Sequence, residues 1–170
     1  ELAIKRCLVG GFEKVYELNR NFRNEGLSTQ HNPEFTMLEY NEAYLDYLDY
    51  MNFTEDMLRE VAKEVTGSLQ VSYQGTIVDF GKPFARISLR DVVIQHYDDL
   101  SESDCSDAGT LRTLLDSLHI PFDRKRSVNS LLLDLFEAGV EEHLIQPTFI
   151  TGYPLEASPL ARRSEERPDL

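Results

Sequence analysis

Two runs of alternating residues on either side of a turn-rich stretch constrain this chain most strongly. Apolar and polar side chains alternate from Val15 to Phe22, and a second such run extends from Phe35 to Asn41. Successive side chains of a strand point to opposite faces, so alternation of this kind predicts half-buried β-strands. The residues between the runs include the turn formers Gly26, Ser28, Asn32 and Pro33. The simplest prediction is an antiparallel hairpin with a long polar loop.

The two faces of this predicted hairpin differ in chemistry. One carries the apolar side chains of the first run, Tyr16, Leu18 and Phe22. The other gathers Glu17, Asn19, Asn21, Arg23, Glu25, Phe35 and Glu39. Buried charge is costly unless it is paired, so the second face is a poor core face. Two interpretations are open: a solvated face with an Arg–Glu pair, or a site for an anionic and aromatic ligand. In the second, arginine would bind phosphate, Phe35 would stack, and carboxylates would receive an ammonium group.

The same stretch resembles a known motif. The run from Phe22 to Glu39 closely resembles motif 2 of class II aminoacyl-tRNA synthetases, in the form found in lysyl-tRNA synthetases. The similarity extends over essentially all 170 residues. Further segments match in order: Leu8–Val15, Asp79–Phe84, His143–Ile150 with Tyr153 and Pro154, and Ser158–Arg162. An Arg-x-Glu pattern alone is weak, whereas a long motif accompanied by these segments is specific.

The resemblance implies an α+β fold, with an antiparallel sheet of the class II synthetase type backed by helices and a small helical insertion. We expect residues 1–83 to form the motif 2 part of the catalytic core and residues 84–143 the helical insertion. Residues 144–170 would return to the core, truncated before motif 3. Leucine stripes within 84–143 independently predict short amphipathic helices that pack against one another.

Local signals predict the remaining elements. Thr54 would cap a helix that ends before Gly67, and Leu69–Tyr73 would pair with Thr76–Phe80 around a tight turn. Ser88 and Ser127 would cap two helices of the insertion. Finally, residues 146–151 would form a strand that returns to the main sheet.

For activity, the resemblance implies that the parent enzyme activates lysine with ATP to lysyl-adenylate and transfers it to tRNA(Lys). Mg²⁺ would assist, with ligands outside these 170 residues. The parent would be a homodimer. The chain begins without methionine, and neither motif 1, motif 3 nor an anticodon-binding barrel appears in it. We therefore expect a catalytic-domain fragment that is inactive by itself.

The resemblance also assigns roles to individual residues. Arg23 would be catalytic, because it holds the α-phosphate of ATP and the lysine carboxylate through the transition state. The other ATP contacts would be Glu25 at the adenine amino group, His31 at the outer phosphates, Asn32 supporting the loop and Phe35 stacking on adenine. Glu1 and Glu39 match the carboxylates that receive the two amino groups of lysine. No general base is needed, since the attacking carboxylate is ionised at neutral pH.

Two positions depart from the family pattern. Gln30 stands where many bacterial relatives have arginine, so we expect one phosphate contact to be weaker. Asn41 stands where family members usually carry a tyrosine that helps to enclose the lysine side chain, and it is the third candidate lysine-binding residue. In an unbroken strand the preceding Tyr40 points away from the face of Glu39, so Tyr40 cannot replace that tyrosine.

Two other functions remain open at this point. One is a paralogue that joins lysine to a protein acceptor in place of tRNA, for which the sequence upstream of Glu1 would be decisive. The other is a non-catalytic, synthetase-like regulatory or binding module, against which an intact downstream motif 3 would argue.

Composition narrows the remaining possibilities. A net charge of −13 excludes a general polyanion binder. Cys7 and Cys105 lack metal-type spacing and indicate free thiols in a reducing compartment.

No apolar run is long enough for a membrane span and no signal peptide opens the chain, so we expect a cytoplasmic protein without membrane contact. His96, His119 and His143 are interpreted as surface or packing residues, and no metal ligand is predicted.

Overall fold

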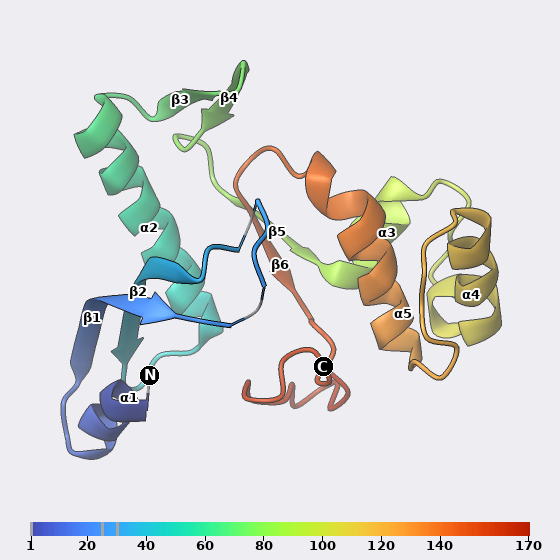
Figure 1. Cartoon of the computed structure of the whole chain (residues 1–170), viewed down its shortest axis with the longest axis horizontal. Helices are drawn as coiled ribbons and strands as arrows, with labels where there is room; N and C mark the ends of the chain where they lie inside the picture. Colours follow the sequence, from blue (N-terminus) through green and yellow to red (C-terminus); the bar gives the residue numbers. More distant parts are fainter. Residues whose placement is uncertain (1, 25, 30) are drawn as a thin grey trace. The chain divides into compact units, whose positions relative to one another are not determined.

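The structure is a computed structural model that describes residues 2–24, 26–29 and 31–170 (Figure 1). The chain divides into two compact units, residues 1–53 and 54–170. The first contains helix α1 (Leu2–Val9) and strands β1 (Lys14–Phe22) and β2 (Glu34–Glu42). Helix α2 (Tyr47–Thr66) is continuous through the division between the units. The mixture of helices and small sheets confirms the predicted α+β class, while the predicted division at residues 83 and 143 stays a prediction.

Strands β1 and β2 form the predicted antiparallel hairpin. Lys14 pairs with Glu42 at the open end and Phe22 with Glu34 at the loop end. The same register continues one step further, because the backbone N–H of Arg23 donates to the carbonyl of Pro33 at 2.9 Å. The ladder therefore holds the odd-numbered residues from 15 to 23 and from 35 to 41 on one face.

The apolar side chains that β1 contributes to the hairpin are exposed, contrary to the prediction that their face would be the half-buried one. Tyr16, Leu18 and Phe22 are 74%, 66% and 70% exposed, whereas Glu17 and Glu39 on the other face are partly covered. The strand assignment is right, but the pattern does not say what covers a face. Besides the hairpin, the described residues up to position 53 contribute an eight-residue helix and the start of α2, which is too little to bury both faces.

Helix α2 begins seven residues before the predicted Thr54 cap, at Tyr47. The cap is a pair of aspartates. Asp46 Oδ1 accepts from the N–H groups of Leu48 (2.8 Å) and Asp49 (3.1 Å), and Asp49 Oδ2 accepts from the N–H of Asp46 at 3.1 Å. This reciprocal arrangement satisfies donors that a helix start leaves open, so Thr54 lies inside the helix. The end is as predicted: Gly67 has a φ of 73° and donates to the carbonyl of Lys63.

Strands β3 (Gln70–Tyr73) and β4 (Thr76–Asp79) form the second predicted hairpin. The two turn residues, Gln74 and Gly75, have φ values of 47° and 83°. Positive φ at both central positions is the geometry of a type I′ turn, which matches the right-handed twist of the strands it joins.

Apart from α2, the helices of the second unit are short and enclose its core. They are α3 (Leu89–His96), η1 (Asp104–Ser106), α4 (Ala108–Ser117), α5 (Val128–Leu135), the π-helical η2 (Phe136–Val140) and η3 (Glu141–His143). Ser88 and Ser127 cap α3 and α5 as predicted, each accepting from the N–H three residues later. Leucines carry most of the core, with Leu111, Leu115, Leu131 and Leu135 wholly inaccessible. Helix α5 packs against α3 and α4 (Figure 1), which confirms that the helical stripes bury one another.

The last strand pairs differently from the prediction. Strand β6 (Thr148–Thr151) lies parallel to β5 (Ala85–Ser88), with Ala85 opposite Thr148. The predicted return to the main sheet is wrong, because the hydrogen bonds of β6 go to β5 and those of β1 go to β2. In the described part of the chain, the strands therefore form three separate two-stranded sheets. No helix there has the length and apolar character of a membrane span.

Candidate functional site

The polar face of the hairpin brings Arg23 and Phe35 together. The central carbon of the Arg23 guanidinium lies 5.6 Å from the centroid of the Phe35 ring. Phe35 pairs with Asn21, so Arg23 occupies the next position along the same face, as the sequence predicted. Among the described residues Arg23 has no ion-pair partner, whereas Arg20 on the opposite face pairs with Glu34 at 3.1 Å. An exposed guanidinium beside an aromatic ring suits a ligand with both phosphate and a planar base.

The loop that follows Arg23 holds His31 through Ser28. The Ser28 hydroxyl contacts His31 Nδ1 at 2.9 Å and accepts from the His31 backbone N–H at 3.0 Å. The Ser28 N–H in turn donates to the His31 carbonyl at 3.1 Å. Because Nδ1 is engaged, Nε2 is the ring nitrogen left for a ligand. Asn32, the next candidate along the loop, is exposed.

Ser28 is a residue whose role the sequence interpretation missed, since it was assigned only as a turn former. A serine three positions before a candidate histidine is the signal that could have found it, because such hydroxyls bond to nearby backbone groups.

Glu39 and Asn41 continue the same face away from the loop. Glu39 pairs with Glu17 and Asn41 with Val15, and all four residues are partly covered. Four positions separate Phe35 from Glu39, which places them about 13 Å apart along the strand. The face thus presents, in order, a cation, an aromatic ring, a carboxylate and an amide.

Tyr40 lies on the opposite face, as predicted. Its ring stacks on Tyr50 of α2 at 5.6 Å with an interplanar angle of 4°, and lies 5.2 Å from Phe53. These contacts hold Tyr40 away from the face of Glu39, so Asn41 is the side chain that stands beyond the carboxylate.

Three positions with sequence-based assignments lie outside the described residues. They are Glu1 and Glu25, expected to contact lysine and adenine, and Gln30, the departure in the loop. Their predicted roles stay predictions.

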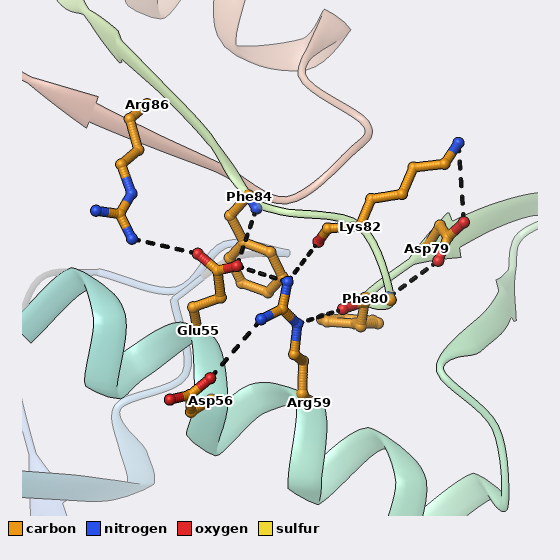
Figure 2. Close-up of polar contacts among 9 residues, drawn as sticks. Glu55, Asp56, Arg59, Asp79, Phe80, Lys82, Phe84 and Arg86 are labelled. Carbon is orange, nitrogen blue, oxygen red and sulfur yellow. Dashed lines mark hydrogen bonds and ion pairs between the residues drawn. The ribbon is translucent and has the colours of Figure 1, made fainter.

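A second concentration of charge surrounds Glu55 on α2 (Figure 2). Its side chain is almost wholly buried, and its oxygens lie 2.6 Å from Arg59 and 3.4 Å from Arg86. The Phe84 backbone N–H also donates to Glu55, at 3.3 Å. Arg59 in turn donates to the carbonyls of Phe80 and Lys82, both at 2.8 Å. These groups satisfy one another, so the cluster fastens residues 80–86 to α2 and leaves no charge for a ligand.

The second unit has an apolar hollow. It is open, has a volume of about 360 Å³, and is lined by residues of α2, β4 and β6 together with the segments next to these strands, among them Phe80, Phe84 and Phe149. Its lining has no charged side chain to meet a phosphate or an ammonium group. The hairpin face is therefore the better candidate for a charged ligand.

Comparison with known proteins identifies the family of the chain. The family model described as tRNA synthetases class II (D, K and N) matches residues 1–170. A lysine–tRNA ligase of Legionella pneumophila (strain Lens) is 49% identical over 170 residues, covering 100% of this chain and 34% of the relative. One from Thioalkalivibrio sulfidiphilus is 52% identical over 168 residues (99% and 34%), and one from Chromohalobacter salexigens 51% identical over 170 (100% and 34%). The chain spans about a third of the length of these curated relatives.

Proposed function

The chain belongs to the class II tRNA synthetase family (D, K and N), and from that premise we propose that it forms the motif 2 part of a lysine–tRNA ligase. The parent enzyme activates lysine with ATP and transfers it to tRNA(Lys). Its partners are lysine, ATP and tRNA(Lys), and its assembly is a homodimer. Full-chain similarity to relatives named lysine–tRNA ligase supports the choice of lysine within the family.

The observation that carries the proposal is the arrangement of Arg23, Phe35 and Glu39 on one strand face. The adenine of ATP stacks on Phe35, and Arg23 beside the ring meets the α-phosphate. Lysine extends along β2, so that its carboxylate lies near Arg23 and an amino group reaches Glu39. The separation of about 13 Å between Phe35 and Glu39 suits a ligand with a base at one end and an extended side chain at the other.

The chemistry of adenylate formation explains why a cation, Arg23, lies where the α-phosphate and the lysine carboxylate would meet. The lysine carboxylate attacks the α-phosphorus, so two anionic groups must meet and negative charge grows in the transition state. A preorganised guanidinium at that point stabilises the developing charge more than it stabilises the ground state. Arg23 has this role, His31 Nε2 faces the outer phosphates, and Asn32 supports the loop. Glu25 contacts the adenine amino group, and Glu1 receives the other amino group of lysine.

Mg²⁺ supplies further neutralisation of phosphate in enzymes of this chemistry. The described residues include no group of three or more His, Cys, Asp or Glu side chains that could hold a metal ion. These described residues do not fit a magnesium site, and no step here depends on one.

Lysine-dependent ATP–pyrophosphate exchange by the full-length protein tests the proposal. We expect exchange with lysine and none with aspartate or asparagine, followed by aminoacylation of tRNA(Lys). Exchange without tRNA aminoacylation would indicate a protein acceptor, and absence of exchange with every amino acid would indicate a non-catalytic module.

A further inference from the structure

Two histidine side chains from separate elements meet in the second unit, far from the proposed synthetase site in sequence. His96 ends α3 and His143 ends η3. Their ring centroids are 5.0 Å apart, and the rings are inclined by 51°. Both side chains are exposed, so solvent and ions reach them.

The His143 ring is held by a hydrogen bond that leaves the lone pair of its other nitrogen available. His143 Nδ1 lies 2.8 Å from the carbonyl oxygen of Gly139. A carbonyl only accepts, so Nδ1 carries the proton and Nε2 of the neutral ring has the lone pair. A backbone carbonyl that fixes the tautomer in this way is the usual partner of a metal-binding histidine.

His96 is held at the same place by its neighbours. Its ring meets Tyr97 edge-on at 4.7 Å, and its Nε2 lies 3.9 Å from the position that a β-carbon on Gly139 would take. The Tyr97 hydroxyl is itself anchored, because it donates to the carbonyl of Leu135 at 3.3 Å. The His143 ring is therefore held by the Gly139 carbonyl, and the His96 ring packs against Tyr97 close to the same glycine.

The spacing of the rings matches shared coordination. A metal ion about 2.1 Å from a ring nitrogen lies roughly 3.2 Å from the ring centroid, so two rings meeting at a tetrahedral angle have centroids about 5 Å apart. The neighbouring sequence adds negative charge: Asp98 and Asp99 follow α3, and Glu141 and Glu142 precede His143. Such charge favours a cation over an anion at this position.

We propose that His96 and His143 form a binding site for a divalent transition-metal ion such as Zn²⁺, with water completing the coordination. The two imidazoles supply one nitrogen each. Imidazole suits zinc, copper and nickel, whereas magnesium and calcium prefer oxygen ligands. The site is independent of the proposed synthetase activity and does not rest on it.

Calorimetric titration of the full-length protein with ZnCl₂ tests the site, using His96→Ala, His143→Ala and, as a matched control, His119→Ala. We expect the wild type and the control to bind one zinc equivalent that each of the other two variants binds at least tenfold more weakly. Zinc binding that is unchanged in both variants, or weakened equally in the control, would overturn the proposal, as would a wild-type protein that binds no zinc.

A measurement on the wild type covers the case in which a variant fails to fold. Zn²⁺ should slow the modification of His96 and His143 by diethyl pyrocarbonate, read by peptide mass spectrometry, while His119 reacts at an unchanged rate. Equal reaction rates of His96 and His143 with and without zinc would exclude the site.

Discussion

The hydroxyl oxygen of Tyr97 lies only 2.2 Å from the position that a β-carbon on Gly139 would occupy. The glycine is thus required by packing, in the π-helical segment that accommodates the tyrosine. We expect Gly139→Ala to lower the free energy of unfolding by about 1–3 kcal/mol, as overpacking usually does. Thermal unfolding measures the effect. Tyr97→Phe removes the oxygen, so Gly139→Ala should cost less in that background; additive losses in the double variant would contradict this explanation.

Arg23→Ala should lower lysine-dependent pyrophosphate exchange by roughly 100-fold or more, because a preorganised cation at developing charge contributes about 3–4 kcal/mol. The matched control is Arg20→Ala, which removes an exposed pair with Glu34 on the other face of the same strand. Its activity should stay within about twofold of wild type. Exchange by Arg23→Ala within threefold of wild type would refute the assignment.

Glu39→Gln should raise the KM for lysine at least tenfold, since hydrogen bonds to a charged group are worth roughly 1.5–3 kcal/mol. Asn41→Tyr should lower that KM modestly by adding an aromatic wall beside the ammonium group. Glu42→Gln is the control, because Glu42 pairs with Lys14 at the end of the hairpin. If Glu39→Gln had no effect and Asn41→Tyr abolished lysine binding, the pocket would lie elsewhere.

Glu55→Gln should destabilise the second unit by about 3 kcal/mol, because it leaves Arg59 and Arg86 without their buried countercharge. Asp56→Asn provides the comparison. Asp56 is 79% exposed and 3.7 Å from Arg59, so its loss should cost well under 1 kcal/mol. Chemical denaturation that ranks the two variants equally would show that the cluster does not depend on the Glu55 charge.

Cys105 should resist alkylation in the folded protein while Cys7 reacts. The Cys105 side chain is inaccessible, and burial raises its pKa above that of an ordinary thiol, although Arg90 opposes the shift. A raised pKa lowers the thiolate fraction at neutral pH, and only the thiolate reacts. Iodoacetamide labelling at pH 7.5 followed by peptide mapping measures the two rates. The difference should vanish in denaturant; equal rates in the native protein would contradict the buried environment.

Local sequence patterns, each spanning only a few residues, predicted much of this fold correctly. Alternation and turn formers located β1, β2, β3 and β4, and a serine three residues before a helical N–H located the starts of α3 and α5. The N-terminus of α2 was not predicted, because Asp46 and Asp49 lie inside an aromatic-acidic run that resembles a loop. Thr54 offered a stronger capping signal in sequence, but the helix had already begun.

Features that depend on distant residues could not be predicted in this way. Strands β5 and β6 are four residues each and join residues 85–88 to 148–151, so nothing in either segment identifies its partner. The register that places Arg23 beside Phe35 followed from the hairpin, but the Ser28–His31 contacts did not. The histidine pair at Gly139 joins α3 to η3, and no spacing in the sequence connects them.

The hydrogen bonds made by Arg59 help to determine at which positions this protein tolerates substitution. Besides its ion pairs with Glu55 and Asp56, Arg59 donates to two backbone carbonyls, those of Phe80 and Lys82. Every amino acid supplies a carbonyl, so substitution at position 82 leaves its acceptor in place, whereas a residue without a side-chain donor at position 59 removes both bonds at once. These two hydrogen bonds therefore constrain the residue type at position 59 more than at positions 80 and 82, while Glu55 holds the same segment through the Phe84 N–H and Arg86.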